Sequence, residues 1–408
     1  MSRFFKTSSA IALTFAAATA AFADTPVLQS AGALAFNDAN TLFVGDGRAG
    51  VVHAFDLGDD QIADQSTYAL GRAKTFEGRT IFENINADIG ALLGVPADQV
   101  EINDMVMHKP SKQIFLSVHR GLGPDAEALI VKVNQGKIEL VDLTKANHST
   151  QDLGALPANE TIEFDRPLYQ LAITDIDYYN DEIFVAGVSN EEFGSTLRRI
   201  SYPFDGTAET SKIEIWHAVH AQWETRAPII TQTIVELEGE ATMIALYRCT
   251  PVVRIPLADL EDGKQVRGEM IAELGYGNSP IDTIAYTNAW TGQQNVLVTN
   301  THRSAASYAL DTLATAEEMP TGEGVQPLFG IGGAEYTPIP ISGVVHIDTV
   351  DESWAVTVRE NPEDPRILEM HTLAMPMFFE RSDHVVEMNW DGAPDPFGFH
   401  VDPPLQFN

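Results

Sequence analysis

The feature of the sequence that most constrains the fold is an internal repeat. Six segments share one order: a short strand, a turn, a second apolar strand, a polar loop and a third strand. In each segment apolar and polar residues alternate and turn residues separate the runs, which is typical of antiparallel β-strands. The first strands are predicted to begin near Gly32, Asp104, Asp175, Ile230, Asp282 and Gly343, so the copies start 52 to 72 residues apart.

Repeated antiparallel units of this kind form either a sandwich or a propeller. A four-stranded propeller blade needs about 40 to 45 residues, so no interval between copies comfortably holds two blades. Six copies of one meander favour a ring, because each blade then buries its faces against two neighbours. We therefore predict an all-β, six-bladed β-propeller, with seven blades as the alternative. Strands at 27–30 and 385–390 are expected to close the ring.

One segment between the first two copies has a helical pattern. Residues 86–94, ended by Pro96, are expected to form a short helical insertion that decorates one face. No linker rich in Ser, Gly or Pro divides the rest of the chain. Residues 24–408 are therefore expected to fold as a single propeller domain.

The N-terminus has the pattern of a secretory signal peptide. Arg3 and Lys6 precede an Ala-rich apolar stretch at 11–21, and Ala21-Phe22-Ala23 fits the small-x-small cleavage pattern. The apolar stretch is shorter than the roughly 20 residues of a membrane span, and no later segment is long and apolar enough. We expect residues 1–23 to be removed and the mature protein to be periplasmic or secreted, without a membrane span.

The charge balance excludes whole classes of partner. The chain has 58 acidic and 25 basic residues, a net charge of −33. Such acidity repels phosphate backbones and anionic lipid surfaces, so nucleic acid is excluded as a partner. A salt-rich habitat selects the same composition, so the charge need not describe a ligand. The single cysteine, Cys249, cannot form an intrachain disulfide, and we expect a buried small hydrophobe rather than a reactive thiol.

Two parts of the sequence resemble known propeller families. Residues 298–301 (Val-Thr-Asn-Thr), followed by 308–312, are similar to the YVTN-type propeller repeat. Residues 42–44 with 51–56 resemble the related exported propellers, including gluconolactonase-like and paraoxonase-like proteins. The resemblance covers most of the mature chain as a pattern and one repeat closely. It implies the propeller fold and does not extend to an activity.

Three of the predicted first strands begin with an aspartate: Asp104, Asp175 and Asp282. Because first strands line the channel of a propeller, these carboxylates and the adjacent Asn103 are expected to meet at one channel mouth. Carboxylates this close cannot all ionise without a cation, and Ca²⁺ accepts about six to eight oxygen ligands. One interpretation is therefore a Ca²⁺ site. The other is that these aspartates cap strands by accepting hydrogen bonds from backbone N–H groups.

Arginine follows the second strand in five of the six copies. These residues are Arg48, Arg120, Arg248, Arg303 and Arg359. Planar guanidinium donors suit an anionic or carbonyl ligand, so arginines around an acidic centre predict a binding face. Ion pairs with Asp or Glu of neighbouring blades are the alternative interpretation.

Two histidines in the same loops, His119 and His302, are candidate general bases, because imidazole titrates near neutral pH. Beside a Ca²⁺-bound water or ester carbonyl, such a base would support hydrolysis, as in lactonase-like propellers. A structural role at a strand end is the alternative. His108 and His346 fall within predicted strands and are expected to be core or inter-blade residues.

The sequence lacks a phosphate-binding loop, a Gly-x-Ser-x-Gly elbow, a His-Glu-x-x-His pair and a Cys-x-x-Cys-His site. We therefore favour a monomeric, exported propeller that binds a small molecule or a protein partner on its channel and rim face, without established catalysis. A Ca²⁺-dependent hydrolase of lactones or esters is the first alternative. An accessory subunit of a periplasmic redox enzyme is the second.

Overall fold

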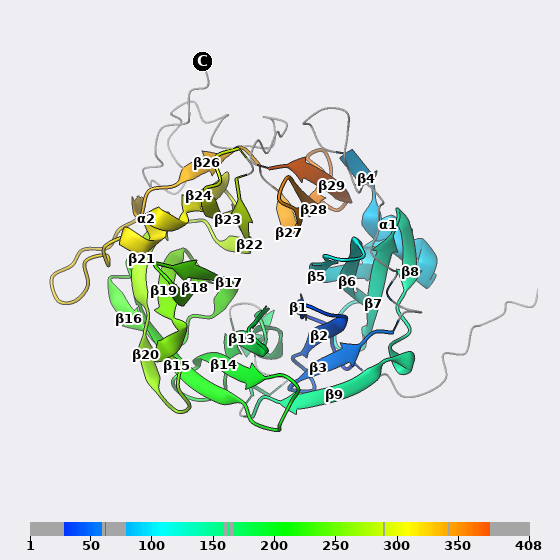
Figure 1. Cartoon of the computed structure of the whole chain (residues 1–408), viewed down its shortest axis with the longest axis horizontal. Coiled ribbons are helices and arrows are strands. Elements are labelled where there is room, and N and C mark those ends of the chain that lie inside the picture. The colour runs from blue at the N-terminus through cyan, green and yellow to red at the C-terminus, as the bar shows by residue number, and fades with distance from the viewer. Residues whose placement is uncertain are drawn as a thin grey trace, which may run out of the picture.

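The structure is a computed structural model that describes residues 28–58, 62, 79–154, 156–158, 162–163, 166–288, 290–341 and 343–375. Over these residues six antiparallel blades stand in a ring around a central channel (Figure 1). Each innermost strand contacts the innermost strands of two neighbouring blades, which closes the ring. The predicted six-bladed β-propeller is confirmed, and the alternative of seven blades is wrong.

The first three blades, numbered along the chain, each have four or more strands, given from the channel outward. Blade 1 contains β1 (Leu34–Phe36), β2 (Thr41–Asp46), β3 (Val51–Asp56) and β9 (Asn147–Asp152). Blade 2 contains β5 (Val100–His108), β6 (Gln113–Arg120), β7 (Glu127–Asn134) and β8 (Lys137–Leu140). Blade 3 contains β12 (Asp175–Tyr179), β13 (Glu182–Val188), β14 (Ser195–Ser201), β15 (Glu209–His217) and β16 (Gln222–Glu224). On β15, β20 (Gln265–Arg267) pairs in parallel.

The last three blades follow the same plan. Blade 4 contains β17 (Ile229–Leu237), β18 (Glu240–Tyr247), β19 (Pro251–Pro256), β21 (Glu269–Leu274) and β25 (Ile331–Gly333). Blade 5 contains β22 (Pro280–Thr287), β23 (Gln294–Asn300), β24 (Ala305–Ala309) and β26 (Thr337–Ile339). Blade 6 contains β27 (Val344–Asp351), β28 (Trp354–Glu360), β29 (Leu368–Ala374) and β4 (Arg79–Phe82).

Short elements connect the blades. The helices are α1 (Ile85–Leu93) and α2 (Leu310–Thr315), and the 3₁₀ turns are η1 (Ala97–Gln99), η2 (Leu143–Lys145), η3 (Leu168–Leu171) and η4 (Leu257–Asp259). A two-stranded sheet joins β10 (Ile162–Glu163) and β11 (Arg166–Pro167). None of the helices within the described part of the chain is long and apolar enough to cross a membrane.

Two strand exchanges, rather than the chain ends, close the ring. The inner-strand contacts give the order of blades around the ring as 1, 3, 4, 5, 6 and 2, so blade 2 lies between blades 6 and 1 (Figure 1). After β3 the chain adds β4 to the outer edge of blade 6, builds blade 2, and returns to add β9 to the outer edge of blade 1. The expected closure is wrong for residues 28–30, which form no strand, and residues 385–390 lie outside the described residues.

The helix predicted at 86–94 is confirmed as α1, but it is not a surface decoration. Its N-terminus is capped by Asn84, whose side chain accepts a hydrogen bond from the backbone N–H of Ala87, and it ends at Gly94 in the left-handed conformation. Ile85 and Ile89 are fully buried in one apolar cluster with strands of blades 2 and 6. The helix therefore packs between two blades and belongs to the core.

Close packing within blade 3 also explains one glycine. A Cβ atom at Gly187 in β13 would lie 2.0 Å from the carbonyl oxygen of Ala172. No side chain fits at that distance, so glycine lets the chain leading into β12 cross directly over β13. The signal peptide predicted at 1–23 lies outside the described residues.

Candidate functional site

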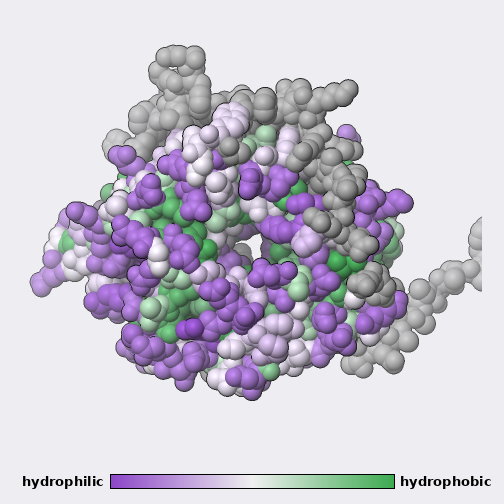
Figure 2. Space-filling view, viewed as in Figure 1, coloured by the Kyte–Doolittle hydropathy of each residue, from purple (hydrophilic) through white to green (hydrophobic). Residues whose placement is uncertain are grey.

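The first strands begin, and the second strands end, on one face of the ring, which we call the mouth face. The strand register shows this arrangement: in blade 2, Val100 at the start of β5 pairs with Arg120 at the end of β6. The loops after the second strands therefore lie on the mouth face, and with them all five arginines and both candidate histidines. Figure 2 shows the channel opening at the centre of the ring, with hydrophilic side chains at its rim.

The structure brings Asp104, Asp175 and Asp282 together in the channel. Burial, then the charge of Asp175, raises the pKa of Asp104 well above its ordinary value. Burial, then the charge of Asp104, does the same to the pKa of Asp282. Burial raises the pKa of Asp175 to about 6. The three carboxyl groups therefore repel one another in a poorly hydrated space, as the sequence analysis expected.

Each of these carboxylates also joins two blades through backbone hydrogen bonds. Asp104 accepts from the backbone N–H of Leu34 in blade 1 at 2.6 Å, and Asp175 accepts from Gln232 in blade 4 at 2.7 Å. Asp282 accepts from Ile347 in blade 6 at 2.7 Å. The second oxygen of each carboxylate accepts from the next residue of its own strand. The structure thus contains the backbone hydrogen bonds that the strand-capping interpretation expects, while coordination of Ca²⁺ by these residues stays a prediction.

Three further titratable groups lie in the channel that were not predicted from the sequence as site residues. Burial, then Asp175 and Asp348, raises the pKa of Asp177 well above its ordinary value, and Asp177 Oδ2 is buried without a hydrogen-bond partner in the described structure. Asp348 accepts from the backbone N–H of Met107 at 2.7 Å. His346 Nδ1 lies 3.6 Å from Asp104 Oδ1, and burial lowers the pKa of this histidine to about 4. Side chains two residues apart on a strand point the same way, so the spacing of Asp177 from Asp175 is the sequence signal that could have identified Asp177.

A cavity of about 430 Å³ opens at the channel mouth. Its lining includes Glu101, Asn103, His119, Tyr169 and Thr174, together with residues 30–33. Asn103 Nδ2 and Thr174 Oγ1 are buried and have no hydrogen-bond partner among the residues described. The cavity thus combines room for a small molecule with two polar atoms whose hydrogen bonds the protein leaves open.

His119 lines this cavity, but both of its ring nitrogens are engaged. Its Nε2 accepts a hydrogen bond from the backbone N–H of Ala31 at 3.2 Å. Its Nδ1, which then carries the proton, lies 3.1 Å from Glu101 Oε2. His302 is exposed, bonds Thr301 Oγ1 through Nδ1 at 2.9 Å, and is outside the cavity lining. His119 thus has both ring nitrogens occupied and His302 lies outside the cavity, and both general-base assignments stay predictions.

The arginines occupy the mouth face without lining the cavity. Arg120 forms an ion pair with Glu127 in its own hairpin, and Arg359 Nε lies 3.8 Å from Glu369 Oε2 in the adjacent strand. Arg48 donates to the carbonyl of Gly123, to that of Pro124 and to the hydroxyl of Tyr169. All three arginines thus contact the protein itself, but Arg120 and Arg359 pair with Glu of their own blades rather than of neighbouring ones, and ligand binding by the arginines stays a prediction.

The remaining two arginines lie near blade 4, Arg303 beside Glu273 and Arg248 next to Cys249 in the chain. The guanidinium of Arg303 packs on Gly275, and its charge acts on Glu273. Glu273 has no exposed surface, and burial raises its pKa to about 8. Arg248 donates its backbone N–H to the carbonyl of Pro228.

Cys249 is exposed, so the prediction of a buried small hydrophobe is wrong. This residue occupies the turn between β18 and β19 with a positive φ of 80°, beyond the packed strands.

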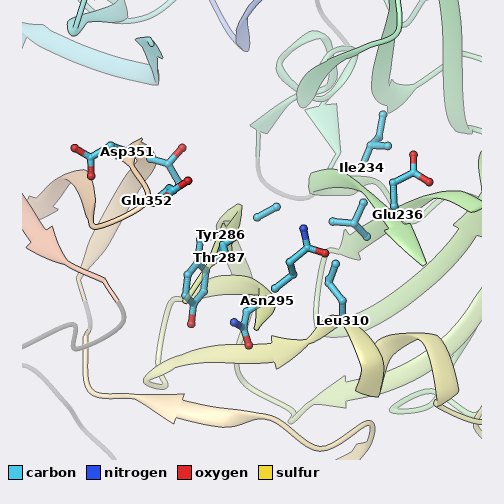
Figure 3. Close-up of a pocket in the computed structure, with 12 residues that line it drawn as sticks. Ile234, Glu236, Tyr286, Thr287, Asn295, Leu310, Asp351 and Glu352 are labelled. Carbon is cyan, nitrogen blue, oxygen red and sulfur yellow. The ribbon is translucent and has the colours of Figure 1, made fainter. Parts of the chain in front are cut away.

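A second cavity, of about 350 Å³, lies where blades 4, 5 and 6 adjoin. Figure 3 shows Asp351 and Glu352 on one side of it, Ile234 and Glu236 on the other, and residues of β22, β23 and α2 between them. These positions are at the ends of first strands and the starts of second strands, on the face opposite the mouth. No residue predicted as part of a site lines this cavity.

Comparison with known proteins does not assign a family. No family model and no curated protein matches the chain. Among solved structures, virginiamycin B lyase from Staphylococcus aureus is similar at 10% identity and a TM-score of 0.36, over 85% of this chain and 95% of that one. Arabinanase from Bacillus subtilis is similar at 12% identity and a TM-score of 0.32, over 67% and 94%.

The extracellular domain of a two-component system from B. thetaiotaomicron is similar at 10% identity and a TM-score of 0.34. That match covers 85% of this chain, which spans 38% of the length of the other protein. Likenesses this distant carry no argument about activity, and the propeller assignment rests on the sheet order itself.

Proposed function

We propose that this protein is an exported binding propeller that takes a small polar molecule, or a polar group of a protein partner, in the cavity at the mouth of its channel. The observation that carries the proposal is the pair of buried atoms Asn103 Nδ2 and Thr174 Oγ1, which line the cavity without a hydrogen-bond partner within the described residues. A buried polar group left without a partner costs about 1–3 kcal/mol. A bound molecule with oxygen acceptors would accept a hydrogen bond from each of these two atoms.

The chemistry of the cavity favours binding over catalysis. His119, the histidine that lines it, has its two ring nitrogens occupied by Ala31 and Glu101. A general base needs a free nitrogen within hydrogen-bond reach of the proton that it removes. The alternative of a lactone or ester hydrolase therefore requires His119 to release one of these partners, and it also requires a cation in the channel.

We further propose that a Ca²⁺ ion in the channel supports the floor of this cavity. Asp104, Asp175 and Asp282 supply carboxylate oxygens, and Asn103 lies beside them on the same strand as Asp104. The buried, unbonded Asp177 Oδ2 adds an acceptor that no protein donor satisfies in the described structure. A divalent cation would relieve the repulsion that raises the pKa values of these groups.

The binding proposal is tested with the mature protein and a panel of neutral sugars, amino acids and dicarboxylates, each screened by thermal shift and then by calorimetry. The double variant Asn103→Ala/Thr174→Val removes the two atoms that carry the proposal. We expect at least one panel member to bind the wild type and to lose about tenfold or more of its affinity in the variant, since each lost hydrogen bond contributes about 0.5–1.5 kcal/mol.

The matched control is Asp351→Asn/Glu352→Gln, which alters the cavity on the opposite face. This control is expected to bind as the wild type does. Equal affinity of the wild type and Asn103→Ala/Thr174→Val for every bound compound, with both proteins folded, would show that the ligand site is elsewhere.

A further inference from the structure

The hairpin at the outer edge of blade 3 carries a cluster that neither the channel nor the mouth cavity uses. β15 ends at His217, a turn contains His220, and β16 returns to Glu224, with His217 paired with Gln222 across the hairpin. His217 Nδ1 lies 2.9 Å from Glu224 Oε2, and His220 Nδ1 lies 2.5 Å from Glu224 Oε1. The two imidazole rings are 4.1 Å apart between centroids. One nitrogen of each histidine and one oxygen of Glu224 all lie within 4.8 Å of one another.

The three side chains differ in exposure in a way that leaves one side of the cluster open. The side chain of His217 is 1% exposed, that of Glu224 is 17% exposed and that of His220 is 44% exposed. His217 Nε2 is buried and has no hydrogen-bond partner in the part of the chain that the structure describes. His217 therefore turns Nδ1 toward Glu224 and keeps a second, buried ring nitrogen that no described group satisfies.

The surroundings hold the hairpin in place. Trp216 and Trp223, directly opposite each other in the hairpin, pack edge to face with centroids 5.4 Å apart. The guanidinium of Arg267 lies 3.9 Å from the ring centre of Trp223. The carbonyl of Ala218 in the turn accepts a hydrogen bond from the backbone N–H of Leu328 at 3.0 Å. The cluster is therefore anchored by an apolar layer and by a second segment of chain, as a preorganised ligand set requires.

We propose that His217, His220 and Glu224 bind a divalent transition-metal ion of the Zn²⁺ class, with a coordination position left open on the side of His220. Two imidazoles and one carboxylate form a set that suits Zn²⁺ rather than Ca²⁺, which takes oxygen ligands. Zinc sites with three protein ligands keep a fourth position for water or a ligand. Donor atoms around a tetrahedral ion with bonds of about 2.0–2.2 Å lie about 3.4 Å apart, so the present pairs at 2.9 and 2.5 Å would open by roughly 0.5–1 Å to admit the metal.

The test uses the mature protein, stripped with chelator and then titrated with Zn²⁺ by calorimetry in excess Ca²⁺, so that the channel carboxylates are occupied. We expect one Zn²⁺ to bind per chain through this cluster. His220→Gln and Glu224→Gln are each expected to weaken this binding by about 100-fold or more, because each removes a direct ligand. Co²⁺ in place of Zn²⁺ is expected to give the visible absorption of a four-coordinate site, and both variants to lose it.

Glu214→Gln is the matched control, because Glu214 lies on the same strand and pairs with Arg267 instead. It is expected to bind Zn²⁺ as the wild type does. His217 is buried and its replacement risks misfolding, so the half-exposed His220 is the deciding position. Failure of the stripped wild type to take up Zn²⁺ would overturn the inference, as would equal uptake by a folded His220→Gln variant. The outcome is independent of ligand binding in the mouth cavity.

Discussion

Glu273 is a carboxyl group with no exposed surface, held between blades 4 and 5 on the mouth face. Its Oε1 accepts the backbone N–H of Gly275 at 3.1 Å, and the side chain of Thr250 also lies against the carboxyl group. Burial raises its pKa to about 8, from an ordinary value of 4.5. Sequence inspection offered no signal for this group, because its neighbours come from Thr250 and from Arg303 of the next blade.

The titration of Glu273 makes the stability of the protein depend on pH. Between about pH 4.5 and 8 the folded state keeps a proton that the unfolded state has released, so the free energy of unfolding falls as pH rises through this range. Glu273→Gln removes the titration and keeps the side-chain shape. We expect the free energy of unfolding, measured with urea, to fall less between pH 5 and pH 8 in Glu273→Gln than in the wild type. The difference is expected to be a few kcal/mol, because a shift of one pK unit corresponds to about 1.4 kcal/mol.

The exposed Glu240→Gln serves as the control and is expected to follow the wild-type profile. If wild type and Glu273→Gln lose the same stability between pH 5 and pH 8, the carboxyl group is ionised in the folded protein and its burial has been misjudged.

At the scale of single strands, β12 shows how the inner strands serve the channel and the blade contacts together. Asp175 and Asp177 are two residues apart, so both project to the channel side of the same strand. Asp175 accepts backbone hydrogen bonds from two strands, whereas Asp177 Oδ2 has no partner in the described structure. One carboxylate of the pair therefore stabilises the contact between blades, and the other only adds charge to a crowded channel.

Asp177→Asn is accordingly expected to stabilise the protein in the absence of divalent cations. The substitution removes a carboxyl group whose ionised form is disfavoured by burial and by the charges of Asp175 and Asp348, and it breaks no hydrogen bond at Oδ2. We expect a gain of about 1–3 kcal/mol in the free energy of unfolding, measured with urea in chelator. The exposed Asp125→Asn is the control and is expected to change stability by less than about 0.5 kcal/mol. A loss of stability in Asp177→Asn would mean that its carboxylate makes a favourable contact in the folded state.

For the whole molecule, the channel carboxyls couple stability to pH and to cations. The folded pKa values of Asp104, Asp175, Asp177 and Asp282 are all raised. Their contribution to stability is fully present below the unfolded pKa near 3.8 and is lost as pH rises through the folded values. In chelator we therefore expect the melting temperature to fall from pH 5 to pH 8.

Added Ca²⁺ is expected to reverse this fall at pH 8, because a ligand that binds only the folded state stabilises it by mass action. The measurement is a melting curve at each pH with chelator or with Ca²⁺, together with elemental analysis of the protein as purified. Asp282→Asn is expected to abolish the Ca²⁺ effect. A wild-type melting temperature at pH 8 that is the same with chelator and with Ca²⁺ would contradict a Ca²⁺ site in the channel.

Much of the architecture followed from local patterns. Strand composition, alternation and turn residues placed the first three strands of every blade. A strand with one buried face alternates, a strand such as β2 that is buried on both faces is largely apolar, and a hairpin turns at residues that tolerate the turn. The same alignment brought Asp104, Asp175 and Asp282 to one channel, since equivalent positions of a ring converge on its axis. The helical pattern at 86–94, ended by Pro96, predicted the helix that the structure places at 85–93.

Only the tertiary structure decided which segments pair across the ring and which polar groups meet. The outer strands β4 and β9 are short and pair with blades distant along the chain, so nothing local marks their partners. The burial of Glu273 and the engagement of His119 by Ala31 depend on neighbours from other parts of the ring, and Cys249 is exposed because its turn lies beyond the packed strands. Local propensity determines strands and turns, whereas burial and electrostatic environment arise only when distant segments pack together.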